Sequence, residues 1–386
     1  MRYKLLVLFG ICSAVLFGQS LSGNWYGTLD VMGQKLPLVL HLTDSMGTWQ
    51  GTLDSPKQNA FGIPMSSIEV NGKKLAFTID KLHASYQGTL SDSLLIKGDF
   101  KQGAFKATLD FNQQEIQQQE TKKLQDPKEP IPYVQDEVTI YNRTEDFNLS
   151  GTLTHPEQDK LIKTPCVILI TGSGPQDRNE EILGHRPFLV LADQLTRSGY
   201  GVLRMDDRGT GKSEGVFNGA TSKDFVTDIE GAIAFVKTLS YIDTQKIILM
   251  GHSEGGMIAN MVAAKHPEVY GVISLAGPGV LGSDLLKEQQ VLISKAMGAS
   301  EKELKQIKSF SDSFYPLLTM DSMLLVKQKA ELFLTQFAKG IKRKQLRESG
   351  VKDRSTWVKM NSDAYINPWM IYFLNYNPKI DLEQLD

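Results

Sequence analysis

The sequence predicts two folded parts of different class: a small all-β domain, followed by a larger α/β domain with a doubly wound, mostly parallel sheet. Residues 21–111 consist of short alternating runs separated by Gly, Asp, Asn and Ser, which is typical of an antiparallel meander. In residues 134–386, runs rich in Val, Ile and Leu alternate with longer helical patterns. A length of 386 residues also favours more than one domain.

Residues 1–20 precede both domains and are expected to be a signal peptide. Arg2 and Lys4 give the chain a positive start, and the apolar run from Leu5 to Phe17 is followed by small residues. This run is too short for a typical membrane span, so no span is expected once the signal is removed. The sequence therefore predicts an exported protein, periplasmic or secreted, and an uncleaved N-terminal anchor is the alternative.

Composition argues against several classes of partner. The formal net charge of -2 gives no electrostatic reason to expect binding to nucleic acid or to an anionic membrane. After residue 20 the sole cysteine is Cys166, so no internal disulfide is expected, and no Cys/His pattern has the spacing of a metal site. Neither a metal nor another cofactor is predicted, and the oligomeric state cannot be read from the sequence.

The all-β domain at residues 21–111 has a weak internal echo. An aromatic residue, one further residue and Gly-Thr-Leu recur at 25–29, 49–53 and 86–90, as if one hairpin strand were reused. The number of short runs favours a small barrel or a sandwich, with a core filled by side chains rather than a ligand cavity. Residues 112–133 are almost wholly polar with three prolines near the end, which predicts a linker.

The α/β domain is predicted element by element from its hydrophobic periodicity. Residues from about 283 to 350 interrupt the β/α alternation with long, charged, amphipathic runs, and we interpret them as a helical cap insertion. The strands are expected near 136–141, 147–153, 166–171, 201–205, 246–250 and 271–276, and the helices near 187–198, 223–239 and 254–265.

The segment Gly251-His252-Ser253-Glu254-Gly255 matches the G-x-S-x-G pattern of a nucleophile elbow. It joins a buried strand to a helical pattern, so Ser253 is expected on a tight strand-to-helix turn. Gly251 and Gly255 flank it because side chains there would collide in so sharp a bend. The bend also directs the N-terminal amides of the helix toward the serine hydroxyl. Ser253 is therefore the predicted nucleophile, with a chance Gly/Ser turn as the alternative, and His252 is expected to pack.

An oxyanion that forms beside Ser253 needs two backbone N–H donors. One is expected from Glu254, the residue after the nucleophile. The other is expected from the glycine-containing loop 171–175, with Ser173 as the first choice and Gly172 as the second. The alternative interpretation is an ordinary Gly/Pro loop.

Residues 204–213 contain two candidate supporting residues and a segment that resembles a nucleotide-binding motif. Gly211-Lys212-Ser213 resembles the end of a phosphate-binding loop, but the required earlier glycine is replaced by Asp206, so nucleotide binding is not expected. We expect Asp206 and Arg208 to form a buried ion network that supports the elbow, because an interior arginine needs a partner.

Residues 133–386, through the Gly-Ser-Gly loop, the Asp-Arg-Gly turn and the Gly-His-Ser-Glu-Gly elbow, resemble the α/β-hydrolases. They most resemble exported bacterial carboxylesterases with a β-rich N-terminal extension, the EstD-like group. The resemblance implies a Ser–Asp–His triad that hydrolyses short esters through an acyl-enzyme on Ser253, with a small-molecule ester as substrate. Two alternatives remain: a serine peptidase, since prolyl-oligopeptidase-like enzymes share this core, and a non-catalytic acyl- or glycan-binding protein.

The sequence offers no obvious candidate for the triad histidine. The resemblance implies the chain order serine, acid, histidine, and His266 alone follows Ser253. Thirteen helical residues separate the two, a rise of about 20 Å. His185 is the other histidine that could approach the pocket. Since the family's acid and histidine follow further strands, we expect this chain to be a C-terminally truncated product that lacks both and is nearly inactive.

Overall fold

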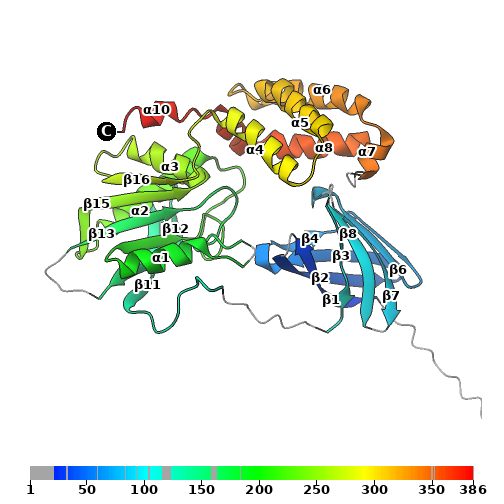
Figure 1. The fold of residues 1–386 in the computed structure, drawn as a ribbon, viewed down its shortest axis with the longest axis horizontal. Coiled ribbons are helices and arrows are strands. Elements are labelled where there is room, and N and C mark those ends of the chain that lie inside the picture. Colours follow the sequence, from blue (N-terminus) through cyan, green and yellow to red (C-terminus); the bar gives the residue numbers. More distant parts are fainter. Residues whose placement is uncertain are drawn as a thin grey trace, which may run out of the picture. The chain divides into compact units, whose positions relative to one another are not determined.

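The structure is a computed structural model, and it describes residues 21–385 except 32–33, 59, 83, 93, 103–104, 115–122, 158–162, 183, 349–350 and 352. The expected signal peptide at residues 1–20 lies outside the described residues, as does part of the expected linker. Figure 1 shows the chain as a ribbon. It divides into two compact units, one holding the strands before Gln117 and one that takes the chain from Gln118 onward.

The N-terminal unit is a ten-stranded antiparallel sheet in the described residues, with the order β4-β3-β2-β1-β10-β8-β7-β6-β5 and β9 paired to β8. Most neighbours in the sheet are also neighbours in sequence, as expected of a meander. The sheet forms a half-barrel, so the alternative of a two-sheet sandwich is not the one adopted. The strands are β1 (Gly23–Val31), β2 (Gln34–Ser45), β3 (Thr48–Ser55), β4 (Ala60–Pro64), β5 (Ser67–Asn71), β6 (Lys74–Ile79), β7 (Ala84–Asp92), β8 (Leu95–Gln102), β9 (Phe105–Thr108) and β10 (Phe111–Asn112).

Large side chains fill the interior of the half-barrel. Trp25 and Leu40 are completely buried, and Phe77, Tyr86 and Phe111 are buried beside them. The Phe77 and Tyr86 rings stack with 5.2 Å between their centroids, and Phe111 meets Tyr86 edge-on at 5.3 Å. Aromatic pairs of this geometry stabilise a core beyond the area that they bury. The repeated aromatic of the sequence echo, represented here by Trp25 and Tyr86, thus supplies the core of this unit.

The second unit contains a six-stranded mixed sheet in the order β11-β12-β14-β13-β15-β16. β11 and β12 run antiparallel to their neighbours, and β14, β13, β15 and β16 are parallel. All six strands predicted from the hydrophobic runs are present. They are β11 (Tyr133–Asn142), β12 (Phe147–Pro156), β13 (Thr164–Ile170), β14 (Gly201–Met205), β15 (Ile242–His252) and β16 (Gly271–Leu275).

Helices cover this sheet on both faces. Alternate residues of β13 enter different cores: Ile168 joins the cluster that includes side chains of α2 (Ser222–Val236) and α3 (Glu254–Ala263), and Val167 joins the cluster with α1 (Pro187–Arg197). A strand buried on both faces has no polar side, which explains its continuous apolar run. The prediction of a doubly wound, mostly parallel sheet is therefore confirmed.

A helical layer follows β16 and has an aromatic core of its own, which includes Phe314, Tyr315 and Leu334. α9 joins this layer to the sheet, since its Leu374 lies in the helical core and its Phe373 lies in the α/β core. The helices are α4 (Gly282–Ala296), α5 (Glu301–Phe314), α6 (Met323–Gly340), α7 (Arg343–Glu348), α8 (Arg354–Tyr365), α9 (Pro368–Asn375) and α10 (Lys379–Leu382), with short 3-10 turns at Pro56–Gln58, Asp80–Leu82 and Tyr315–Leu317 elsewhere.

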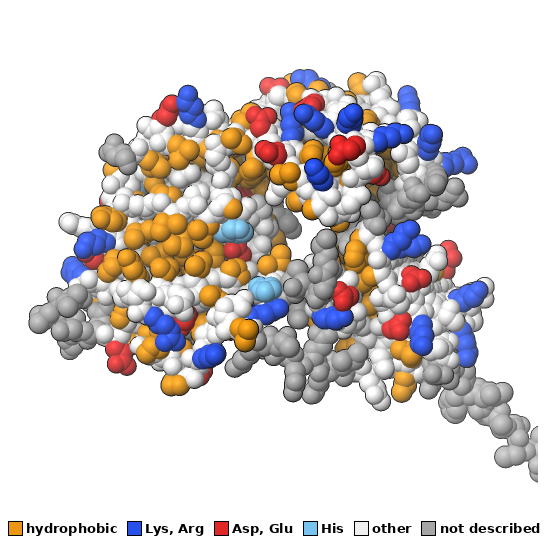
Figure 2. Space-filling view, in the orientation of Figure 1, with side chains coloured by type: hydrophobic (Ala, Val, Ile, Leu, Met, Phe, Trp, Pro, Cys, Tyr) orange, Lys and Arg blue, Asp and Glu red, His pale blue; other side chains and the backbone are white. Residues whose placement is uncertain are grey.

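The two parts of the second unit differ in surface character. On the face in Figure 2, hydrophobic side chains gather over the α/β part, while acidic and basic side chains are interspersed over the helical layer. In the part of the chain that the structure describes, every helix is too short or too polar to cross a bilayer.

Candidate functional site

Ser253 lies in the bend between β15, which ends at His252, and α3, which begins at Glu254. Its backbone has φ 51° and ψ -119°, a conformation that non-glycine residues rarely adopt. Such a residue costs about 1–3 kcal/mol and persists only where its surroundings impose it. Here the Ser253 N–H donates to the Leu275 carbonyl at 2.9 Å, and the Ser253 carbonyl accepts from the Gly256 N–H at 3.0 Å. The bend is thereby tied to the end of β16 and to the first turn of α3.

The two glycines of the elbow have no room for a side chain. A Cβ on Gly251 would overlap the backbone of Gly255, and a Cβ on Gly255 would overlap the carbonyl oxygens of Ile170 and Thr171. The elbow is therefore packed directly against the end of β13, where the loop 171–175 begins. Any larger residue at either position would have to push the bend and the loop apart.

The loop approaches the serine through Gly172. A Cβ built on Gly172 would lie 3.3 Å from the Ser253 Cβ, so the loop backbone lies against the elbow. Within the described residues, the N–H groups of Ser173 and Glu254 have no hydrogen-bond acceptor. These are the two amides that the sequence analysis placed first for an oxyanion. Two free N–H groups beside a serine hydroxyl are what a developing negative charge on oxygen requires.

The structure corrects the prediction that Gly172 could serve as the second choice for the oxyanion donor. Its N–H donates to Glu180 Oε1 at 2.7 Å and is not available to a substrate. The sequence analysis could not separate Gly172 from Ser173, because the distinction depends on a carboxylate eight residues further along the chain. The Ser173 N–H has no acceptor in the described structure, and the same holds for the Gly174 N–H that follows it.

Glu180 is the residue at this site that sequence reasoning missed. It is 6% exposed, and the same Oε1 that accepts the Gly172 N–H lies 2.8 Å from His252 Nδ1. One carboxylate oxygen therefore holds the loop and the elbow together. Glu180 has φ 51°, so the chain adopts an unfavourable backbone conformation at this contact. His252 consequently makes a polar contact with Glu180, where the sequence analysis expected it to pack.

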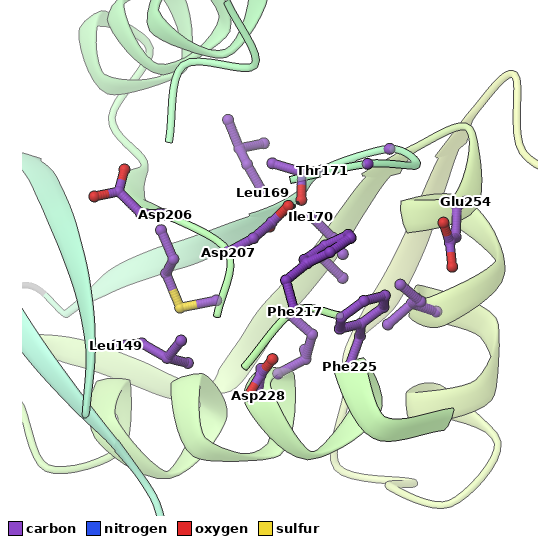
Figure 3. Close-up of a pocket in the computed structure, with 15 residues that line it drawn as sticks. Leu149, Leu169, Ile170, Thr171, Asp206, Asp207, Phe217, Phe225, Asp228 and Glu254 are labelled. Atoms are coloured by element: carbon purple, nitrogen blue, oxygen red, sulfur yellow. Dashed lines mark hydrogen bonds between the residues drawn. The ribbon is translucent and has the colours of Figure 1, made fainter. Parts of the chain in front are cut away.

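Asp207, also passed over, fixes the loop from its other side. Its Oδ1 accepts the Thr171 hydroxyl at 2.5 Å, and its Oδ2 accepts the Gln176 N–H at 2.8 Å. Figure 3 shows Thr171 and Asp207 with their oxygens close together. Burial is the main reason that the pKa of Asp207 is raised to about 8, and the nearby carboxylates of Asp228 and Glu254 raise it further. The carboxyl group is thus largely protonated at neutral pH.

The cavity in Figure 3 lies behind this loop, between Asp207 and Phe225. Its volume is about 30 Å³. A space of this size holds about one water molecule and is too small for an ester substrate. Its polar lining serves to position the loop.

Asp206 and Arg208 do not form the shared ion network that was expected. Asp206 pairs with Arg178, whose Nη2 lies 2.8 Å from Asp206 Oδ2. Arg208 pairs instead with Asp228, at 2.8 Å between Nε and Oδ2, and its guanidinium lies over the Phe147 and Phe225 rings. Both charges are buried and paired, as predicted, but in two separate networks. The first holds the segment after the oxyanion loop, and the second holds α2.

The Glu254 side chain turns away from solvent and connects the elbow to α9. Its Oε1 accepts the Ser222 hydroxyl at 2.6 Å and the Trp369 indole N–H at 2.8 Å. Glu254 is 1% exposed, and this burial raises its pKa, although hydrogen bonds from Ser222, Trp369 and Ser173 act in the opposite direction. The carboxyl group of Glu254 thus makes structural contacts with α2 and α9.

In the described residues, none of the histidine rings hydrogen bonds to Ser253, and His83 lies outside them. Each described ring that the sequence analysis weighed as a base has another partner. His252 contacts Glu180, His185 contacts Gln125, and His266 contacts Glu230 and Glu268. The described residues also contain no group of three or more His, Cys, Asp or Glu side chains placed to hold a metal ion.

Parts of the chain are similar to known proteins. The family described as "Serine aminopeptidase, S33" matches residues 186–366. A 2-hydroxy-6-oxononadienedioate/2-hydroxy-6-oxononatrienedioate hydrolase of Escherichia coli is 33% identical over 119 residues, which is 31% of this chain and 38% of that protein. Esterase EstD of Thermotoga maritima is 25% identical over 166 residues, 43% of this chain and 38% of that protein. The chain thus spans about 38% of the length of these curated relatives.

Among solved structures, the Pyrococcus furiosus esterase Pf2001 superposes with a TM-score of 0.35 and 20% identity, over 47% of this chain and 62% of that one. The family match at residues 186–366 falls on the second unit, which contains the doubly wound sheet and its helices. The second unit accordingly has a fold of the α/β-hydrolase type and follows an antiparallel half-barrel, and the chain is similar over part of its length to hydrolases and to an esterase.

Proposed function

We propose that the chain is a serine hydrolase that acts on carboxylic esters through an acyl-enzyme on Ser253. The observation that carries the proposal is the backbone of Ser253, held at φ 51° in the bend between β15 and α3. Strain of this kind is retained at functional sites, where it places a reacting group. Two further observations support the proposal: the N–H of Glu254, the next residue, and that of Ser173, in the loop that lies against the elbow, have no acceptor in the described residues.

The chemistry follows from these three groups. Ser253 Oγ attacks the ester carbonyl carbon while its proton passes to a solvent water, and the carbonyl oxygen becomes an oxyanion that accepts hydrogen bonds from the two N–H groups. Collapse of this intermediate expels the alcohol and leaves an acyl group on Ser253, which water then removes. An oxyanion site without a positioned base still accelerates the reaction by about 10³–10⁴ over water, so slow acylation of Ser253 is expected in any case.

Covalent labelling tests the nucleophile. The chain is incubated with an excess of a fluorophosphonate for several hours, and the adduct is counted by intact mass and located by peptide mapping. One adduct on Ser253 is expected, and none in Ser253→Ala. The matched control is Ser274→Ala, because Ser274 is exposed and pairs in register with Gly251 on the neighbouring strand. This variant should be labelled like the unmodified chain. Equal labelling of Ser253→Ala, or no adduct at all, would exclude Ser253 as the nucleophile.

A serine peptidase is the second candidate, and the description of the family that matches residues 186–366 favours it. Both activities use the same attack by Ser253, so the leaving group distinguishes them. Acylation by p-nitrophenyl acetate is compared with acylation by alanine p-nitroanilide at equal concentration. Each rate is divided by the rate of the same reagent with Ser253→Ala, because the ester is intrinsically more reactive than the anilide. A larger acceleration of the ester supports the esterase, and a larger acceleration of the anilide supports the peptidase. Binding without acylation by either would favour the non-catalytic alternative.

We also propose that the protein is exported, periplasmic or secreted. The support is the positively charged start and short apolar run of residues 1–20. Expression in a bacterial host, followed by N-terminal sequencing of the protein in each fraction, tests this. A mature N-terminus near residue 21 in the periplasm or medium is expected. Retention of residue 1 in a cytoplasmic product would contradict it.

A further inference from the structure

A second, larger cavity also borders the loop that carries Ser173. Its volume is about 570 Å³, and it is lined by three short segments: 173–174, 217–220 and 367–369. These come from the loop after β13, the loop before α2 and the start of α9. Unlike the small cavity behind the loop, it is large enough for the acyl part of an ester, since ligand sites typically occupy about 300–1,000 Å³.

Two residues that line the cavity are linked to the surroundings of Ser253. Ser173, which lines it, follows Gly172, and a Cβ on Gly172 would lie 3.3 Å from the Ser253 Cβ. Trp369, which also lines it, is hydrogen bonded at 2.8 Å to Glu254, the residue after the nucleophile. An acyl group whose carbonyl oxygen meets the N–H groups of Ser173 and Glu254 would therefore lie at the entrance to this cavity.

The two aromatic side chains that line the cavity, Phe217 and Trp369, each pack against a second aromatic ring. Phe217 stacks on Phe225 with 5.3 Å between ring centroids. Trp369 stacks on Phe373 at 5.4 Å, and its indole N–H is fixed by Glu254. Side chains that are already ordered lose little entropy when a ligand binds, so a preformed aromatic site favours a flat apolar ligand.

The lining carries no charged side chain in the described residues. The Asn367 amide is already engaged, since its Oδ1 caps α9 through the Met370 N–H at 2.8 Å and its Nδ2 donates to the Ala364 carbonyl at 3.0 Å. Asn218 is exposed and has no hydrogen-bond partner in the described part of the chain. A carboxylate on the ligand would lose its hydration here and find no cation in exchange, which is strongly unfavourable.

We propose that this cavity is the acyl pocket and that it accepts uncharged, apolar acyl groups, aromatic ones included, while it rejects acyl groups that carry a second carboxylate. The assignment rests on the proposed function, because it takes Ser253 as the group that is acylated. It gives Phe217 and Trp369 the role of specificity residues, and it makes Asn218 the position at which charge selectivity can be changed.

Binding to Ser253→Ala tests the pocket without any need for catalysis. The probes are benzamide and 4-carboxybenzamide, which share the ring and differ by one carboxylate, and binding is followed by ligand-observed NMR titration. Benzamide should bind at least about tenfold more tightly. Phe217→Ala should weaken benzamide by roughly fivefold through loss of one aromatic wall. Phe61→Ala is the control, because Phe61 is a 62% exposed phenylalanine of the N-terminal unit.

A variant on the exposed loop provides a test that does not depend on core packing. Asn218→Lys should strengthen binding of 4-carboxybenzamide and leave benzamide within about twofold. Equal binding of the two probes, no binding of benzamide, or no effect of Phe217→Ala would each overturn the proposal. If benzamide binds as expected and the fluorophosphonate fails to label Ser253, the pocket stands and the esterase assignment fails, so the two outcomes are separable.

Discussion

At the scale of single residues, two carboxylates hold the loop beside Ser253 in place through hydrogen bonds. Glu180 uses one oxygen to accept the Gly172 N–H and to contact His252, while Asp207 accepts Thr171 and Gln176 on the other side of the same loop. Each holds the loop backbone from outside, which leaves the Ser173 N–H free. Positioning of this kind matters because a displacement of about 1 Å at a reacting centre can cost 10²-fold in rate.

The first prediction concerns Glu180. Glu180→Gly removes the carboxylate and at the same time relieves the strain at φ 51°, because glycine adopts this conformation freely. We expect fluorophosphonate labelling of Ser253 to slow by about 10- to 100-fold, with thermal stability reduced by no more than about 1 kcal/mol. The rate is read by intact mass and the stability by calorimetry. Glu181→Ala, the exposed neighbour, is the control, and a labelling rate unchanged in Glu180→Gly would refute a positioning role.

The second prediction concerns the pH dependence that Asp207 confers. Its folded pKa of about 8 lies above the value of about 3.9 for an unfolded aspartate. Its contribution to stability is therefore complete below about pH 3.9 and is lost as the pH rises through 8, by up to about 1.4 kcal/mol per unit. Asp207→Asn cannot ionise. Its melting temperature should rise relative to that of the unmodified chain between pH 4 and pH 8, and then stay constant.

Differential scanning calorimetry at several pH values measures this difference. Asp363→Asn is the control, because Asp363 is 67% exposed and pairs with Lys359 at the surface. It should show no comparable trend. A constant difference between Asp207→Asn and the unmodified chain over the whole range would show that Asp207 titrates normally.

At the scale of elements, buried ion pairs fix the connections around the sheet. Arg208, at the end of β14, is 2% exposed and pairs with Asp228 of α2, and Arg178 pairs with Asp206 in the same way. A buried pair is expensive to break, since removal of one partner leaves the other charge uncompensated. These pairs place α2 and the loop after β13 relative to the carboxyl ends of the strands, where the elbow lies.

The third prediction is at this scale. Arg208→Ala should reduce the free energy of unfolding of the α/β unit by about 3–5 kcal/mol, because Asp228 would keep its hydrogen bond from Asn142 but lose its buried counter-charge. Arg208→Lys should recover only part of the loss, since lysine cannot reproduce the paired contacts of the guanidinium. Lys212→Ala removes a contact with Glu137 at the surface, where Lys212 is 76% exposed, and should change stability by less than about 0.5 kcal/mol. Urea unfolding measures all three, and equal losses for Arg208→Ala and Lys212→Ala would disprove the distinction.

At the scale of the whole molecule, the chain contains two units with separate cores. Leu40 is fully buried in the half-barrel, and Ile168 is fully buried in the α/β sheet. Each unit has its own hydrophobic cluster, and the division of the chain falls near Gln117. Domains with independent cores commonly unfold as separate cooperative transitions.

The fourth prediction follows from this division. Leu40→Ala and Ile168→Ala each create a cavity at a fully buried site and should each cost about 2–5 kcal/mol. Calorimetry of the full chain should show two transitions, with Leu40→Ala lowering one and Ile168→Ala lowering the other. A single transition that both substitutions lower equally would mean that the two units unfold as one.

The sequence predicted those features that depend on residues close together in the chain. Hydrophobic periodicity located the six strands and three helices of the α/β unit, because a strand buried on both faces must be apolar throughout. The elbow was recognisable for the same reason: the steric conflict that requires Gly251 and Gly255 arises within a few residues of Ser253 and against the strand beside it.

Whatever depended on distant partners was decided by the tertiary structure. The choice between Gly172 and Ser173 required Glu180, and the pairing of Asp206 and Arg208 with separate partners required Arg178 and Asp228. Residue type alone indicates that a buried charge needs a partner, but it does not say which partner, because hydrogen bonds act over about 3 Å in space whatever the separation in sequence. The sequence by itself thus determined the class of fold and the strained turn at Ser253. Which amides stay free, and which side chains line the cavity beside them, was settled only when the chain folded and brought 172, 180, 252 and 369 together.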